Sequence, residues 1–456
     1  MIEADEGHTL VQQLAARLTA MRSAKLPSAV ADRAKMCVLD QLGVQIRGAT
    51  LPHVRPAIDV ALALGGAPES TVPLMGVRLP APYAAFVAAT FGHSCEFDDS
   101  HFLCGHPGVC VIPTVLALGE HLHSTGRDIL SALVAGYEAM VLSVGPIHPT
   151  TMATGWHGTK VAGVFGAAAA TAALLDLDVA RTAQALAIAG SEASGTSEYD
   201  RSGGEVKRVH PGMAARSGIE AALLARAGLT GPLTILEGQR GIYRLFGDGT
   251  PPEIDAVWQT RFHILGVIHK LYPAVGTHHA PLDALRHLMK TEKLEADEVE
   301  RITVWTAPWA ILHGGATGRP TDMISAQFNL GFSLATRLLE NSNALQLYLD
   351  GRRWCDPAVV ALSERVDVRA MTFQPGESEL GALVEVELRD GRVLSRRQQT
   401  FRGQPDDPAL PTDIEEKFRD LVSGILPAGR GEQIVDAVGR LDSLEDAREL
   451  TDLLQP

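Results

Sequence analysis

The sequence predicts a mainly α-helical protein: a large all-helical domain built from both chain ends, and a smaller α+β domain between them. Three observations support this class. Apolar residues recur at helical spacing through residues 8–227, in segments rich in alanine. Alternating, strand-like patterns begin only after about residue 268. Residues 404–456 then return to helical periodicity, so we expect them to rejoin the first domain.

The first domain, residues 1–267 and 404–456, is expected to consist of successive helices with almost no strand signal. Gly163 and Gly166 lie in an alanine-rich segment, where the missing side chains would let a neighbouring helix come close. The expected helices cover residues 8–22, 29–46, 55–64, 82–95, 112–123, 128–144, 161–175, 178–189, 213–227, 414–421 and 434–441.

The second domain, residues 268–403, carries the strand signals. Asp390-Gly391 separates two alternating runs, which is a strong β-hairpin signature. A helix is expected at 326–340. The expected strands cover residues 299–306, 366–371, 383–388 and 392–397.

The composition excludes several classes of function. Of 456 residues, 46% are hydrophobic and only 5% aromatic, which suits closely packed helices with small residues at their crossings. The net charge is −14 and the basic residues form no long run, so we expect neither a nucleic-acid partner nor an anionic membrane partner. The most apolar run, residues 161–175, is too short to span a membrane, and glycines interrupt it.

Cysteine usage and the N-terminus indicate a cytoplasmic protein. The five cysteines are an odd number for a disulfide framework, and they include no Cys-x-x-Cys pair. We expect those near residues 95–110 to be small packing residues. The chain starts with an acidic segment that lacks the order of a signal peptide.

The stretch from His93 to Gly108 gathers ionisable groups between apolar helices. Burying such groups is costly unless they are paired or used, so we expect an acid/base cluster. Two alternatives are a metal site and a polar helix end with capping residues. The spacing disfavours a metal, because His101 and His106 are five residues apart and Asp98 and Asp99 point in two directions.

Three further segments carry polar groups suited to an anionic substrate. His157 lies in a glycine-rich turn before a helix, where anions bind favourably. Lys207 and Arg208 precede His210 and would clamp carboxylates, with Lys207 free to stabilise an enediolate. A polar island near the domain change contains Lys270, Tyr272 and His278. The competing interpretations are solvated side chains for His157, Lys207 and Arg208, and a buried structural histidine at 278 or 279.

Neither a Rossmann fingerprint nor a P-loop is present in the sequence, which argues against nicotinamide and ATP chemistry. We therefore expect no cofactor and no metal. The remaining alternatives from the residues are a metal-dependent hydrolase, a non-catalytic carboxylate-binding protein, and an enzyme that acts on a larger substrate.

Taken together, the motifs resemble the MmgE/PrpD family, which includes 2-methylcitrate dehydratase, cis-aconitate decarboxylase and iminodisuccinate epimerase. The pieces that carry the resemblance are Glu96-Phe97-Asp98-Asp99-Ser100, His106-Pro107-Gly108, Gly155-Trp156-His157-Gly158-Thr159, Val206-Lys207-Arg208-Val209-His210-Pro211-Gly212, Gly231-Pro232, Leu236-Glu237-Gly238 and Lys270-Leu271-Tyr272-Pro273. The resemblance implies a helical domain, a smaller α+β lid domain, a homodimer, and cofactor-independent chemistry on di- or tricarboxylates in a cleft between the domains.

The resemblance also implies roles for particular residues. His106, His157 and Lys207 match family active-site positions. Ser100 stands where the decarboxylases carry threonine. Two departures concern the substrate: Glu96 replaces the usual aspartate, and Val275 stands where animal-type cis-aconitate decarboxylases carry histidine. Lys270 and His278 match lid positions.

The expected reaction moves a proton at a carbon next to a carboxylate, and its outcome is dehydration, epimerisation or decarboxylation. We expect His157 or Lys207 to be the base, His106 the acid or its partner, and Glu96 an orienting group beside Asp99. The expected substrate-binding residues are Asp99, Ser100, Arg208, His210, Lys270, Tyr272 and His278.

Overall fold

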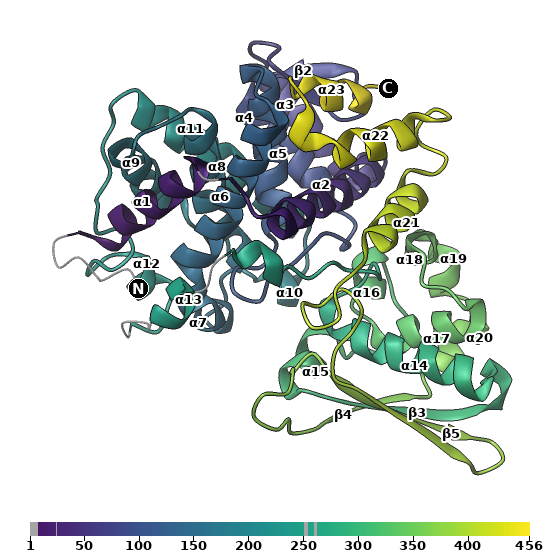
Figure 1. The fold of residues 1–456 in the computed structure, drawn as a ribbon. Helices are drawn as coiled ribbons and strands as arrows, with labels where there is room; N and C mark the ends of the chain where they lie inside the picture. The colour runs from purple at the N-terminus through teal and green to yellow at the C-terminus, as the bar shows by residue number, and fades with distance from the viewer. Residues whose placement is uncertain (1–7, 24, 250–253, 260–261) are drawn as a thin grey trace. The chain divides into compact units, whose positions relative to one another are not determined.

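The computed structural model describes residues 8–23, 25–249, 254–259 and 262–456 (Figure 1). The chain forms two compact units, one made of Met1–Val267 with Pro411–Pro456 and the other of Ile268–Leu410. The chain rejoins the first unit at Pro411, later than the expected residue 404. The protein is mainly α-helical, and the strands among the described residues lie in two small sheets, which confirms the predicted class.

The first unit consists of helices and one short hairpin. Its helices are α1 (Leu10–Ser23), α2 (Ser28–Gly48), α3 (Arg55–Leu64), α4 (Ala81–Gly92), α5 (Pro107–Leu122), α6 (Gly126–Val144), α7 (His148–Ala153), α8 (Gly158–Leu174), α9 (Val179–Ala189), α10 (Tyr199–Ser202), α11 (His210–Arg226), α12 (Ile242–Leu245), α13 (Asp255–Gln259), α21 (Pro411–Val422), α22 (Arg430–Gly439) and α23 (Arg448–Thr451). Single 3-10 turns connect several of them, and one of these turns, Val206–Val209, carries Lys207.

The hairpin corrects the expectation of an all-helical first domain. Strands β1 (Ser70–Val72) and β2 (Val77–Leu79) pair in antiparallel fashion. Strands of three residues are too short to show a readable alternation in sequence. They are fixed instead by α5, because Ser70 Oγ donates to the Ala117 carbonyl and Thr71 N donates to Glu120 Oε2.

Helix α8 packs against α5, α6, α9 and α11, and small residues make these close crossings possible. A Cβ added to Gly166 would lie 3.0 Å from the Gly136 carbonyl of α6, and one added to Gly136 would meet the Gly166 carbonyl at the same distance. A Cβ at Gly163 would lie 2.5 Å from Cys110 Sγ of α5. The expected role of Gly163 and Gly166 is thus confirmed.

By length and composition alone, the continuous helical stretch Gly126–Ala153 could cross a membrane, although no segment was expected to do so. Within the protein, 89% of its most apolar 18-residue window is buried. It contains α6, whose neighbours are other helices of the first unit, and it is a core helix of that unit.

The C-terminal segment returns to the first unit through a buried ion pair. Helix α21 packs along α2, where the Lys417 ammonium pairs with the Asp40 carboxylate. Lys417 Nζ also donates to the Phe97 carbonyl at 2.6 Å and lies 3.9 Å from the centre of the Phe97 ring. The last helices therefore hold the loop that follows α4.

The second unit is an α+β structure. Its strands are β3 (Val299–Thr306), β4 (Val366–Ala370), β5 (Ala382–Leu388) and β6 (Val393–Gln398). They lie in the order β4-β3-β5-β6, with β3 and β4 parallel and the other pairs antiparallel. Its helices are α14 (His279–Glu292), α15 (Pro308–Gly314), α16 (Met323–Gln327), α17 (Leu330–Glu340), α18 (Leu345–Leu349), α19 (Gly351–Trp354) and α20 (Pro357–Ser363).

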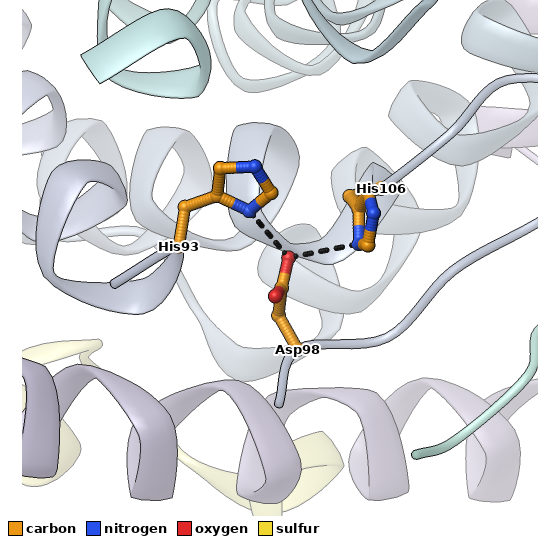
Figure 2. Close-up of side chains that lie close together, drawn as sticks. All are labelled: His93, Asp98 and His106. Atoms are coloured by element: carbon orange, nitrogen blue, oxygen red, sulfur yellow. Dashed lines mark hydrogen bonds and ion pairs between the residues drawn. The ribbon is translucent and has the colours of Figure 1, made fainter. Parts of the chain in front are cut away.

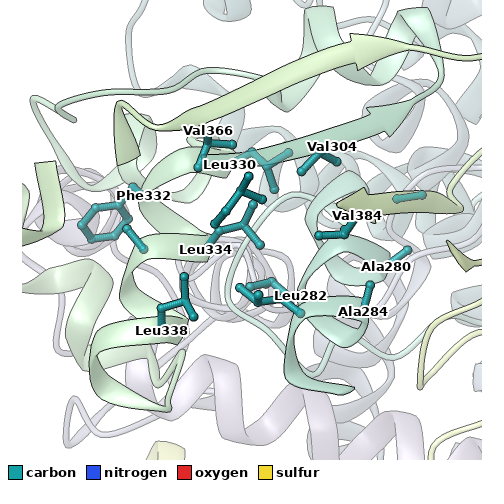
Figure 3. Close-up of a cluster of buried hydrophobic side chains, with 14 of the residues drawn as sticks. Ala280, Leu282, Ala284, Val304, Leu330, Phe332, Leu334, Leu338, Val366 and Val384 are labelled. Carbon is teal, nitrogen blue, oxygen red and sulfur yellow. The ribbon is translucent and has the colours of Figure 1, made fainter. Parts of the chain in front are cut away.

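Its core is formed by α14 and α17 against the sheet. Leu282, Val304, Leu334 and Val384 meet in one buried cluster (Figure 3). The helix predicted at 326–340 is wrong as a single helix, because Asn329 interrupts it and caps α17 by accepting from Phe332 N at 2.7 Å. Helix α14 was not predicted.

The crossing of α2 and α4 is the fold feature on which the site most directly depends. A Cβ added to Gly48 would lie 1.9 Å from the Phe91 carbonyl, two residues before His93. We predict that Gly48→Ala lowers the free energy of unfolding by about 1–3 kcal/mol or more, because the added methyl group would force the backbone of α2 or α4 to shift. The matched control is Gly439→Ala, whose added Cβ would meet nothing within 4 Å. Urea unfolding measures both, and equal midpoints would contradict the prediction.

Candidate active site

Three histidines stand where three helices of the first unit begin. His106 precedes α5, His157 precedes α8, and His210 is the first residue of α11. The predicted starts at 112, 161 and 213 were wrong, because the first turns carry proline or glycine rather than apolar residues. The starts of the helices lie together: His106 N donates to Thr159 Oγ1 at 3.2 Å. Helix N-termini favour negative charge, so this region suits an anion.

Asp98 joins two of the histidines of this region. Its Oδ2 lies 2.9 Å from His93 Nδ1 and 3.0 Å from His106 Nδ1. Figure 2 shows the carboxylate between the two imidazoles, with His93 following α4 and His106 preceding α5. The His106 Nδ1 also lies 2.7 Å from the Asp99 carbonyl oxygen.

These contacts fix where the protons lie. Burial alone would raise the pKa of Asp98, but His106 and His93 outweigh it and hold the pKa well below the usual range. Asp98 is therefore an ionised acceptor. A carbonyl oxygen can only accept, so His106 Nδ1 carries a proton and Nε2 is the nitrogen that can take up another. The His106 side chain is 16% exposed and the His93 side chain 0% exposed, so of these two histidines only His106 can contact a molecule from solution.

The same three residues have the spacing of a potential metal site, since His93, Asp98 and His106 offer ligand atoms within 4.8 Å of one another. The donor set fits a hydrogen-bonded cluster better. A metal ion on His106 Nδ1 would have to replace the proton donated to the Asp99 carbonyl. A metal pair of His101 and His106 was disfavoured by their spacing in sequence, and among the described residues His101 is not part of this cluster.

A second pair of histidines lies next to this cluster. His157 Nδ1 and His210 Nδ1 are 2.9 Å apart, so one of them donates to the other. Burial lowers the pKa of His157 well below its usual value and, with Lys160, that of His210 to about 4. Both are therefore neutral at pH 7. The His157 ring lies 5.9 Å from the His93 ring and 5.6 Å from the ring of Tyr199, which the sequence analysis did not select.

Lys207 and Glu96 form an ion pair, with Nζ and Oε2 2.6 Å apart. Glu96 has φ +51, a left-handed conformation that is uncommon outside glycine and that turns the chain between α4 and Asp98. Arg208 is buried and its guanidinium lies 3.4 Å from Glu205. Ser100 is partly buried. Two predicted catalytic residues, Glu96 and Lys207, thus lie together.

Asp99 serves the site through its main chain. Its carboxylate accepts from Gly108 N at 2.8 Å and from the Tyr137 hydroxyl at 2.7 Å. Burial raises the pKa of Asp99 to about 7, against the opposing hydrogen bond from Tyr137. Its carbonyl oxygen, by contrast, is the acceptor for His106. Asp98 and Asp99 therefore point in two directions, as their adjacency in sequence suggested.

Lys270, Tyr272 and His278 belong to the second unit and are buried there. The Tyr272 hydroxyl donates to Asp283 Oδ1 at 2.6 Å. His278 Nδ1 lies 3.1 Å from Ser333 Oγ, and its Nε2 lies 2.7 Å from the Gly314 carbonyl. Within this unit the two side chains thus make structural hydrogen bonds, and their predicted binding of substrate stays a prediction.

The comparisons with known proteins show the family of the chain. Residues 12–255 match the MmgE/PrpD N-terminal domain and residues 272–442 match the MmgE/PrpD C-terminal domain. The chain therefore belongs to the MmgE/PrpD family.

Its relatives include cis-aconitate decarboxylases. The chain is 28% identical to the enzyme of Homo sapiens, over 98% of this chain and 95% of that protein. It is 27% identical to that of Mus musculus, over 98% and 93%. It is also 27% identical to that of Aspergillus terreus, over 94% and 92%. These relatives are lyases, and they support a lyase role for this chain.

The buried histidines make stability depend on pH. Burial lowers the pKa of His101 to about 3 and those of His148 and His210 to about 4. Below about pH 6.5 these histidines take up protons in the unfolded chain but stay neutral in the folded chain. The free energy of unfolding therefore decreases as the pH is lowered. Burial raises the pKa of Asp99 and of Glu138 to about 7, which acts in the opposite direction, but the histidines are more numerous.

We predict that the Tm falls steadily from pH 7 to pH 5. Thermal unfolding followed by circular dichroism measures it, with His148→Asn expected to show a shallower slope and the exposed His121→Asn an unchanged one. A Tm that stays constant or rises over this range would show that these histidines do not stay neutral in the folded protein.

Proposed function

We propose that the protein is a cofactor-independent lyase that acts on a small di- or tricarboxylate by moving a proton at a carbon next to a carboxylate. The observation that carries this proposal is His106. Its Nδ1 proton is held between the Asp99 carbonyl and the Asp98 carboxylate, and its Nε2 is open to proton transfer. A carboxylate next to an imidazole stabilises the imidazolium that forms when the base takes up a proton.

The surroundings of His106 favour an anionic substrate. The starts of α5, α8 and α11 provide the positive ends of three helix dipoles, and Lys207 provides an ammonium group. Glu96 holds this ammonium in place. A carboxylate that binds here would have its developing enediolate stabilised by the same cationic groups.

Dehydration is the first candidate reaction. His106 Nε2 takes the proton from the carbon next to the carboxylate, and the C–H electrons form the new double bond. The β-hydroxyl leaves with its bonding electrons and takes a proton from the Lys207 ammonium, which yields water. In this assignment His106 is the base and Lys207 is the acid, which reverses the roles expected from the sequence. His157, neutral and paired with His210, binds and orients the substrate.

Decarboxylation is the second candidate, and the names of the relatives favour it. The C–C bond to a carboxylate breaks, carbon dioxide leaves, and the electron pair stays on the substrate carbon. That carbon takes a proton from the His106 imidazolium. Ser100 replaces the threonine of decarboxylases, and Val275 replaces the histidine of the animal-type cis-aconitate decarboxylases. Both departures support a different substrate. Epimerisation, the third outcome, would need a proton donor on the opposite face, for which His157 is the candidate.

Location and assembly are further proposals. Among the described residues all five cysteines are free thiols, which supports the cytoplasm. A homodimer rests on the family resemblance alone, and light scattering would test it. We propose neither a nucleic-acid nor a membrane partner.

One experiment separates the candidate reactions. The protein is incubated in D₂O with 2-methylcitrate, citrate, cis-aconitate and iminodisuccinate, and products and solvent exchange are followed by NMR. A dehydratase gives an unsaturated acid and water, a decarboxylase gives a product one carbon shorter, and an epimerase incorporates deuterium without changing the skeleton. The proposal fails if no acid of this class exchanges or reacts.

We predict that His106→Asn, His157→Ala and Lys207→Ala each lower turnover by about 10²–10⁴-fold while the fold stays intact. The matched control is the exposed His121→Asn, which should retain full activity. Dialysis against EDTA should leave activity unchanged. Turnover near that of the unchanged protein in all three variants would contradict the assignment, and loss of activity with EDTA would favour the metal alternative.

A further inference from the structure

His93 is a buried histidine that the proposed reaction does not use. Its side chain is fully buried, so it cannot reach a substrate. Its ring nevertheless lies 5.0 Å from that of His106 and 5.9 Å from that of His157, between the two candidate catalytic histidines. A polar ring in such a place costs desolvation energy and needs a compensating role.

Among the described residues, the side chain that lies within hydrogen-bond distance of His93 is Asp98. His93 Nδ1 lies 2.9 Å from Asp98 Oδ2, the oxygen that also faces His106. Asp98 Oδ1 and His93 Nε2 are buried and find no hydrogen-bond partner in the part of the chain that the structure describes. Asp98 is therefore oriented by two imidazoles alone, and His93 is the one that a substrate does not reach.

We infer that His93 is a positioning residue for the reaction: it donates to Asp98 and holds that carboxylate where it fixes the His106 Nδ1 proton and sets the proton affinity of His106 Nε2. This inference rests on the proposed function. Without the donor at position 93, Asp98 loses one of its two partners. The carboxylate can then rotate away, and while it faces His106 its whole charge acts on that imidazole.

Other titratable groups act on His93 and His106 from the surrounding elements. They are Glu96 with Lys207, together with His148, His157 and His210. All of these groups are present in both variants at position 93, so a difference between the two variants reports on the donor itself.

The test compares His93→Phe with His93→Asn. Asparagine can present an N–H near the place of Nδ1, whereas phenylalanine fills the volume without a donor. We expect turnover to fall about 10–100-fold in His93→Phe and to recover to within about threefold in His93→Asn. The acid limb of the kcat/KM profile should move to higher pH by about one unit in His93→Phe alone. The reason is that the whole negative charge of Asp98 then stabilises the His106 imidazolium.

A second measurement needs no substrate. In ¹⁵N-histidine-labelled protein, the imidazole of His106, assigned by comparison with His106→Asn, should carry its proton on Nδ1 when neutral. It should stay charged to a higher pH in His93→Phe than in the unchanged protein. Circular dichroism and the Tm confirm that both variants fold.

Three results would overturn the inference: full activity in His93→Phe, equal loss in both variants with an unmoved pH profile, or identical His106 titrations. The second of these would mean that position 93 matters only for packing. If no carboxylate reacts but the His106 titration moves as expected, the proposed function fails while the link from His93 to His106 stands.

Discussion

A single buried charge, the carboxylate of Asp98, is the constraint on which the site depends. It is ionised inside the first unit, where an isolated carboxylate would be strongly destabilised. Two imidazoles compensate for it, one on each side (Figure 2). Because both imidazoles turn Nδ1 toward the same carboxylate, the cluster fixes the position of a proton on each ring as well as the charge.

The fold is arranged to bring this cluster together. His93 follows the end of α4, Asp98 lies in the loop held by Lys417, and His106 begins α5. Glycines at the helix crossings bring the backbones close enough for three helix starts to lie side by side. The result is a buried polar cluster on elements that are otherwise packed with alanine, valine and leucine.

Much of this arrangement could be predicted from the sequence, and the limits have physical causes. The spacing of apolar residues predicts most of the long helices and the hairpin at Asp390-Gly391, because burial requires one face of each element to be apolar. It failed at the first turns of α5, α8 and α11, where proline and glycine start the helix. The polar stretch was found, but its pairing was not: His101 and His106 are close in sequence, whereas His93 is the partner that the backbone brings to Asp98.

The ion pair between Lys417 and Asp40 has a consequence for the order in which the protein is made. The first unit contains residues from both ends of the chain, and Lys417 holds the loop that carries Asp98. A nascent chain acquires this lysine only after the whole second unit has left the ribosome. Until then the loop that carries Asp98 lacks its contact with Lys417, so this loop gains its last anchor only late in synthesis.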